Sequence, residues 1–125
     1  MKLKFVVMWS IYVQCKHKRK LVTVHLPAID NAVGKPDTGW VIEKEDESDL
    51  FRVVSQRDFH ASSKDEAAIA LIRKAYALFD GTWSFSGLST LNADRPLYIM
   101  AGANIQTPQH LPPAITSVML EVEQR

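Results

Sequence analysis

The chain has 125 residues, a formal net charge of +1 and a single cysteine, and 46% of its residues are apolar and 23% charged. This length fits one domain with one hydrophobic core, and the composition is typical of a soluble globular domain. It excludes a collagen, a disordered tail and a disulfide scaffold. We therefore expect a single globular domain over residues 1–125.

The N-terminal segment alternates between apolar odd-numbered positions and more polar even-numbered positions from Leu3 to Cys15. Basic residues before an apolar run also outline a signal peptide, but no small-residue cleavage site follows here. The run is shorter than the roughly 18 residues that span a bilayer. The pattern favours a long strand with one buried face, in a cytoplasmic protein.

A second strand is predicted over residues 21–26, with Pro27 as its end. The β-branched residues of this segment, and the short turn before it, favour a hairpin with the first strand. The register that makes one face of the hairpin wholly apolar pairs Val22, Val24 and Leu26 with Cys15, Val13 and Ile11. On the other face the same register brings Tyr12 and Gln14 opposite His25 and Thr23.

The remaining strands and loops follow from apolar alternation and from clusters of turn residues. Strands are expected over residues 40–44, 50–55 and 96–101, and loops over 28–39, 45–49, 81–96 and 102–113. Residues 115–122 follow two prolines, which can begin a helix. Their alternation and β-branched content favour a strand, although the helix stays open as an alternative.

One amphipathic helix is predicted over residues 64–80. Ser63 and Glu66 form a capping box at its start, and Gly81 stands where a C-terminal cap belongs. The apolar stripe that should face the odd-numbered residues of the first strand comprises Ala68, Leu71, Ile72, Ala75, Leu78 and Phe79. The elements indicate an α+β fold, a mainly antiparallel sheet of about six strands in the order ββββαββ with the helix on one face.

The run Lys16, His17, Lys18, Arg19 and Lys20 is the strongest charge feature, and residues 1–26 carry six Lys or Arg and no acid. A basic turn can contact a phosphate backbone, so nucleic-acid binding through this run is one hypothesis. The net charge of +1 is low for a general nucleic-acid binder, and the acidic run 45–49 should lie at the same end of the sheet. A solvated turn is the simpler interpretation.

Candidate polar residues on the outer sheet face are Tyr12, Gln14, Thr23 and His25. A His beside a Tyr can transfer protons, but the register places no carboxylate near the imidazole to orient it. Cys15 and His17 share a strand face, and two ligands are too few for a zinc ion. The sequence therefore predicts no catalytic residue, no metal and no cofactor, and it favours a protein that is not an enzyme.

Two kinds of function remain. The favoured one is a binding protein that acts through a sheet face as a homodimer, because Val6, Met8, Tyr12 and Leu21 would form an apolar patch opposite the helix. The alternative is a small-molecule pocket or minor enzyme where the loop with Trp83 and Phe85 closes over the sheet. In overall character the chain is similar to the small single-domain proteins carried by phages and integron cassettes, a likeness that rests on no motif.

Overall fold

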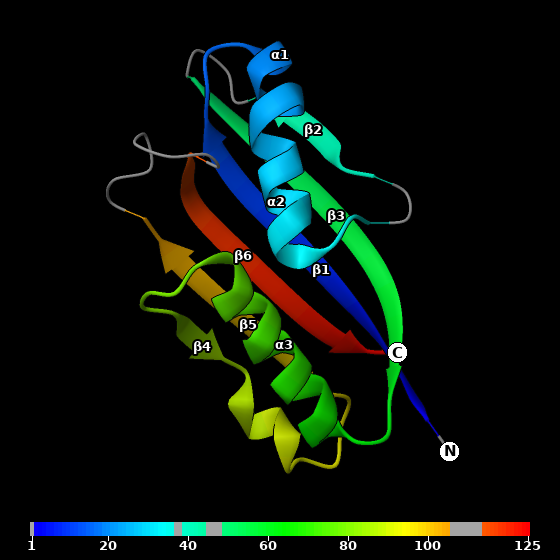
Figure 1. Ribbon diagram of the computed structural model, residues 1–125. Helices are drawn as coiled ribbons and strands as arrows, with labels where there is room; N and C mark the ends of the chain where they lie inside the picture. The colour runs from blue at the N-terminus through cyan, green and yellow to red at the C-terminus, as the bar shows by residue number, and fades with distance from the viewer. Residues whose placement is uncertain (1, 37–38, 45–48, 106–113) are drawn as a thin grey trace.

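The computed structural model describes residues 2–36, 39–44, 49–105 and 114–125 (Figure 1). Within these residues six antiparallel strands form one sheet, in the spatial order β2-β3-β1-β6-β5-β4. The strands are β1 (Leu3–Gln14), β2 (Val41–Lys44), β3 (Leu50–Ala61), β4 (Ser84–Ser86), β5 (Tyr98–Asn104) and β6 (Ile115–Gln124). The expected α+β fold with a six-stranded antiparallel sheet is confirmed, but the order of elements is βαββαβββ instead of ββββαββ, because the predicted second strand is helical and β4 is an additional strand.

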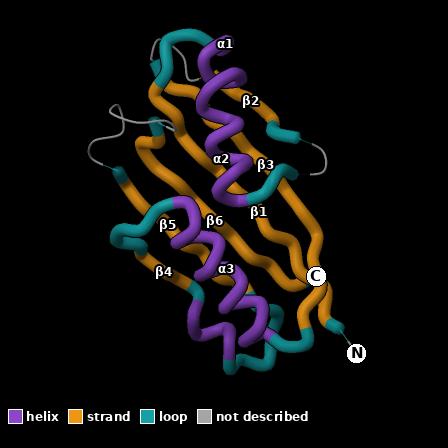
Figure 2. Tube along the Cα trace, viewed as in Figure 1, coloured by secondary structure: helices purple, strands orange, loops and turns teal. Residues whose placement is uncertain are grey.

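Two helical segments lie on the same face of the sheet (Figures 1 and 2). The first runs through α1 (Lys18–Lys20), the π-helical turn η1 (Leu21–His25) and α2 (Leu26–Val33), and the second is α3 (Lys64–Leu78). A short 3-10 turn, η2 (Leu88–Leu91), follows β4. Among the described residues, no helix has the length and the apolar character needed to cross a membrane.

Helix α3 begins as the sequence predicts. The Ser63 Oγ accepts a hydrogen bond from the Glu66 N–H (3.1 Å), and the Glu66 carboxylate accepts one from the Ser62 N–H (3.2 Å). The helix ends at Leu78, so Gly81 is not its C-terminal cap. The cap residue Phe79 leaves the helix in an extended conformation, with φ of −145°, which does not require glycine.

The predicted stripe of α3 is confirmed with one exception. The helix buries Ala67, Ala68, Leu71 and Ala75, and Leu78 and Phe79 pack against the core from its end. The side chain of Ile72 is instead 38% exposed. The residues of α3 that face the sheet are three alanines and Leu71, which form a narrow stripe along the helix. Ile72 lies outside this stripe.

Residues 21–26 are helical, which corrects the predicted second strand. Leu21, His25 and Ile29 are buried at spacings of four residues, whereas Val22 and Val24 are 45% and 38% exposed. Local β-branched content favours a strand, but the buried stripe at helical spacing decides the conformation once the segment packs on the sheet.

Pro27 lies inside this helical segment, in the first turn of α2, instead of ending it. Proline has no N–H to donate, and in a regular α-helix its ring approaches the carbonyl one turn earlier. The π-helical turn η1 ends at His25, just before Leu26, the residue that precedes Pro27, and it replaces the regular α-helical hydrogen bonding in the turn before the proline. The helix continues to Val33 and ends at Gly34, whose φ of 88° favours glycine, so residues 28–33 of the expected loop are helical.

Strand β1 therefore pairs with β3 and β6, and the predicted hairpin register is wrong. Phe5 lies opposite Phe59 on β3 and opposite Gln124 on β6. Strands β3 and β6 have 12 and 10 residues, against six in the segment 21–26, so they pair more of the backbone groups of the 12-residue β1.

Other boundaries shift by a few residues. Strand β3 extends to Ala61, β5 covers residues 98–104, and β4 and η2 lie within the expected loop 81–96. The strand over 115–122 is confirmed as part of β6, which excludes the helix alternative. Most of the expected loops 45–49 and 102–113 lies outside the described residues.

The core lies between the sheet and the two helical segments. The odd-numbered residues of β1 from Phe5 to Val13 are at most 4% exposed and belong to this core, as predicted. Alternation places the even-numbered residues of β1, β3 and β5 and the odd-numbered residues 117–123 of β6 on the opposite side. We call this side the open face, because both described helical segments lie on the other side (Figure 1).

Candidate functional site

Cross-strand pairing arranges the open-face side chains in rows that run across the strands. One row contains Val54, Ser10, Met119 and Gly102. The neighbouring row on one side contains Arg52, Tyr12, Ser117 and Asn104. On the other side two rows follow, with Gln56, Met8, Glu121 and Met100, and then Asp58, Val6, Glu123 and Tyr98.

Apolar and aromatic side chains are accessible on this face. Val41, Met119 and Tyr98 are 61%, 41% and 38% exposed. Met8, Tyr12, Val54 and Met100 are half-buried among their neighbours. Accessible side chains of this kind on one surface are typical of a contact site for a partner.

A hollow of about 340 Å³ opens on the face. Its lining residues come from β1, β4, β5 and β6: Tyr12, Ser84, Gly102, Ala103, Asn104, Ser117, Val118 and Met119. A Cβ atom added at Gly102 would meet nothing closer than the Val118 carbonyl oxygen at 3.9 Å. Because Gly102 and the two serines are small, the hollow has room for a side chain or a ring from a partner.

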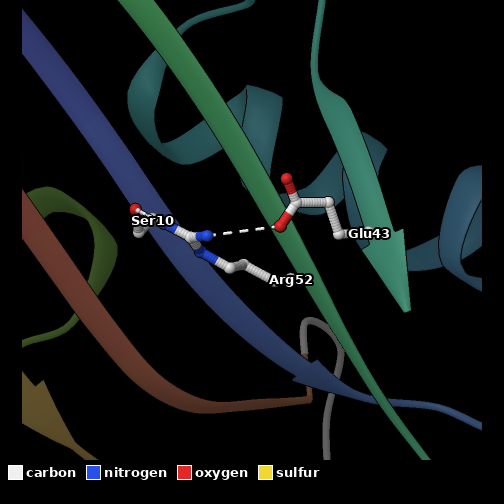
Figure 3. Close-up of polar contacts among 3 residues, drawn as sticks. All are labelled: Ser10, Glu43 and Arg52. Atoms are coloured by element: carbon white, nitrogen blue, oxygen red, sulfur yellow. Dashed lines mark hydrogen bonds and ion pairs between the residues drawn. The ribbon is translucent and has the colours of Figure 1, made fainter. Parts of the chain in front are cut away.

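Arg52 lies opposite Tyr12, which lines this hollow, and fixes a positive charge there. Figure 3 shows how its side chain lies between Ser10 and Glu43. Its Nη1 donates to the Glu43 Oε2 (3.2 Å), and its Nη2 donates to the Ser10 Oγ (3.2 Å). The Arg52 Nε is buried without a hydrogen-bond partner among the described residues. The guanidinium thus links β1, β2 and β3, and the carboxylate of Glu43 balances part of its charge.

The opposite end of the open face carries the carboxylates of Asp58, Glu121 and Glu123, and two of them are paired with basic side chains. Asp58 pairs with Lys4 (3.6 Å), and Glu123 pairs with Arg125 (3.9 Å). Burial raises the pKa of the Tyr98 phenol above its ordinary value, and the carboxylates of Glu121 and Glu123 raise it further. The Tyr98 side chain is therefore a neutral phenol at physiological pH.

The turn η2 holds the start of β5 in place. The Thr90 Oγ accepts a hydrogen bond from the Tyr98 N–H (3.0 Å) and donates to the Gly87 carbonyl (2.6 Å). Gly87 has a φ of 82°, and a Cβ there would contact the Tyr98 carbonyl oxygen, so glycine is required at this position. These contacts position Tyr98 at the rim of the open face.

Two of the predicted binding residues lie on the open face. Tyr12 lines the hollow, and Gln14 is exposed at the end of β1. Thr23 and His25 do not join them, because both belong to the helical turn η1 on the other side of the sheet. The exposed Thr23 Oγ1 donates to the Arg19 carbonyl (2.8 Å) within its own segment.

Trp83 does not form the predicted pocket. Its ring is buried, and its Nε1 donates to the Phe79 carbonyl (2.8 Å), which ties the end of α3 to the approach of β4. Phe85 packs partly against the core. Neither residue lines the two hollows that we describe.

The predicted interface patch needs correction at two of its four positions. Leu21 is fully buried under the helical segment, because residues 21–26 do not form a strand. Val6 lies on the open face but is only 6% exposed. Met8 and Tyr12 remain accessible in part, and Val41, Tyr98 and Met119 join them as residues that the sequence did not single out. Only the strand order brings these five residues onto one face.

The basic segment Lys16–Lys20 is exposed, as predicted, but it begins a helix and is not a hairpin turn. A second hollow, of about 470 Å³, is lined by His17, Arg19, Lys20 and Thr23. None of the ion pairs found among the described residues involves this segment.

His25 and Cys15 have structural contacts. The buried His25 Nδ1 accepts a hydrogen bond from the Ala114 N–H (3.3 Å), and the buried Cys15 Sγ donates to the His17 carbonyl (3.1 Å). Burial lowers the pKa of His25, and the positive charge of Lys20 lowers it further. Among the residues that the structure describes, no three His, Cys, Asp or Glu side chains are grouped to hold a metal ion.

No family model, no curated protein and no solved structure matches this chain. The chemical character of the open face is therefore inferred from its own residues. The open face presents thioether, phenol, hydroxyl and amide groups next to one partly balanced guanidinium, and three carboxylates at its other end. These groups suit contact with another protein surface.

Proposed function

We propose that this protein is a binding protein that works as a homodimer, with the open face as the contact between the two copies. The observation that carries the proposal is the set of accessible apolar side chains, Val41, Met119 and Tyr98, on the face opposite both described helical segments. Contact with a second copy would remove these side chains from water.

The residue types on this face support a protein contact. Of the four methionines and three tyrosines in the chain, Met8, Met100, Met119, Tyr12 and Tyr98 belong to the open face. Methionine, tyrosine and arginine are enriched at the centres of protein interfaces. Methionine also adapts to a facing surface, because its chain is flexible and polarisable.

The size of the face fits a dimer. Strands lie about 4.8 Å apart and residues about 3.4 Å apart along a strand, so the face measures roughly 24 by 20 Å. If both faces are treated as flat, two facing copies would bury about 1,000 Å² in total, and uneven side chains would add to this area. The value reaches the lower limit for a specific interface. A second copy brings a surface of equal size and shape, and two-fold dimers are the commonest soluble assembly.

The first prediction tests this contact with matched glutamate variants. Met119→Glu should raise the dissociation constant of the dimer by roughly tenfold or more, because it would bury an unpaired carboxylate on a face that already carries Glu121. Ile69→Glu is the control, since Ile69 is 50% exposed on α3, on the other side of the sheet. Light scattering and analytical ultracentrifugation at micromolar concentration measure the mass, and circular dichroism checks the fold.

Two results would contradict the proposal. A wild-type mass that stays at 14.1 kDa at high protein concentration excludes the homodimer. If Ile69→Glu dissociates the dimer and Met119→Glu has no effect, the contact lies on the outer side of α3 instead of the open face.

A further inference from the structure

We propose that the two copies pack face to face about a two-fold axis that runs across the strands, so that each copy places Met100 and Tyr98 over the hollow of the other. This inference rests on the proposed homodimer and adds its geometry. The axis lies above the row formed by Ser55, Trp9, Leu120 and Ala101, which are successive cross-strand partners.

The strand register defines which residues such an axis brings together. A two-fold axis across the strands superposes each strand on its own copy in the opposite direction. On β5 the axis passes over Ala101, so Met100 faces Gly102 of the partner, and Tyr98 faces Asn104 of the partner. Gly102 and Asn104 both line the hollow.

The shapes of the two ends of β5 are complementary. At one end Tyr98 is 38% exposed on the rim, and Met100 is half-buried beside it. At the other end the space over Gly102 is open, because an added Cβ would lie 3.9 Å from its nearest neighbour. Tyr98 and Met100 therefore lie on one side of Ala101, and the hollow over Gly102 lies on the other side, on the same strand and the same face. A self-complementary contact requires such an arrangement.

The charges favour the same axis. On β3 the axis passes over Ser55, so Arg52 of one copy faces Asp58 of the other, a carboxylate that also pairs with Lys4 of its own copy. On β6, Glu121 faces Met119 and Glu123 faces Ser117, so no carboxylate faces a carboxylate. An axis parallel to the strands, between β1 and β6, would instead place Arg52 over Asn104 and Glu123 over Val6, which leaves the guanidinium without an acid from the partner.

The second prediction fills the hollow. Gly102→Val should weaken the dimer by roughly tenfold or more, because the new side chain would meet Met100 of the partner. The isolated chain should keep its melting temperature, since the space over Gly102 is open and valine favours a strand. Adding Met100→Ala should restore the affinity, because it makes room opposite the introduced valine. Arg57→Val, on the helix side of β3, is the control that should leave the affinity unchanged.

A charge exchange tests the same axis without altering the hollow. Arg52→Asp and Asp58→Arg should each weaken the dimer, and the double variant should recover most of the affinity. The double variant does not restore the contacts of Arg52 with Glu43 and Ser10 within one copy. A recovery of dimer affinity would therefore come from the contact between positions 52 and 58 of the two copies.

The outcomes separate the axis from the dimer itself. If Met119→Glu dissociates the dimer but Gly102→Val does not, and the charge exchange shows no recovery, the open face is the contact and the proposed axis is wrong. If the wild-type chain is a monomer throughout, the homodimer and its axis both fail.

Discussion

His25 brings an ionisable side chain into the core, where it joins the helical segment to the start of β6. Its ring is 4% exposed, and its Nδ1 accepts the hydrogen bond from Ala114. A protonated Nδ1 could not accept this bond, and the positive charge would be buried near Lys20. The folded state therefore requires a neutral imidazole.

The third prediction concerns stability against pH. The unfolded His25 titrates near pH 6.5, and folding lowers its pKa below that value. As the pH falls below 6.5, the unfolded chain takes up a proton that the folded chain does not, so the free energy of unfolding should decrease. His25→Asn keeps an acceptor oxygen near the Nδ1 position and should flatten this dependence between pH 7 and 5.5.

Chemical denaturation at several pH values measures this slope. His60→Asn is the matched control, because His60 is exposed on β3. An unchanged slope in His25→Asn would contradict the assigned role of His25.

At the scale of single elements, α3 is the one whose sequence and structure agree most closely. The capping contacts at Ser63 and Glu66 depend on neighbours within one turn, so they form wherever the helix packs. Its buried side depends on the sheet as well. Leu71 is 1% exposed, whereas the neighbouring Ile72 is 38% exposed, although both belong to the predicted stripe.

The fourth prediction compares these two neighbours. Leu71→Ala should lower the free energy of unfolding by about 2–5 kcal/mol, because it removes buried methyl groups and leaves a cavity. Ile72→Ala should lower it by less than about 1 kcal/mol, since the side chain is already partly in water. Urea denaturation of both variants measures the difference. Equal losses would mean that α3 has a different buried side.

At the scale of the whole molecule, the two ends of the sheet differ in charge. The basic segment follows β1 at one end, and its residues are exposed. The Cys15 N–H donates to the Asp49 carbonyl (2.8 Å) at that same end, so the acidic run 45–49 ends beside the basic segment. The expected proximity of the two runs is thus confirmed at Asp49, and residues 45–48 lie outside the described part of the chain.

The fifth prediction concerns the basic segment. Replacing Lys18, Arg19 and Lys20 by glutamine should leave the fold intact and keep the melting temperature within about 5 °C, with any shift upward. The reason is that positive charges in the first turn oppose the helix dipole. Differential scanning calorimetry measures the change, and a large decrease would show that the segment is needed for folding.

Nucleic-acid binding through this segment stays a prediction with its own measurement. If the segment contacts phosphates, the same variant should reduce the slope of affinity against salt by about one unit per lost contact. Lack of binding to mixed-sequence DNA and RNA at low salt would exclude it.

The sequence by itself determined the features that depend on near neighbours. The alternation from Leu3 to Gln14 predicted the buried side of β1, and the capping residues predicted the start of α3. Tyr12 was placed correctly on the outer face for the same reason, because alternation alone assigns it there. Each of these patterns depends only on residues that are close together in the sequence.

The tertiary structure alone decided the conformation of residues 21–33 and the composition of the open face. The segment 21–26 has strand-like residues, yet β3 and β6 occupy both edges of β1, so this segment cannot pair with β1 and packs on the sheet as a helix. The hollow joins residues of four strands that are far apart in the chain. Strand order is set by the competition of distant segments for hydrogen-bond partners and core contacts, and no local pattern records which of them pair.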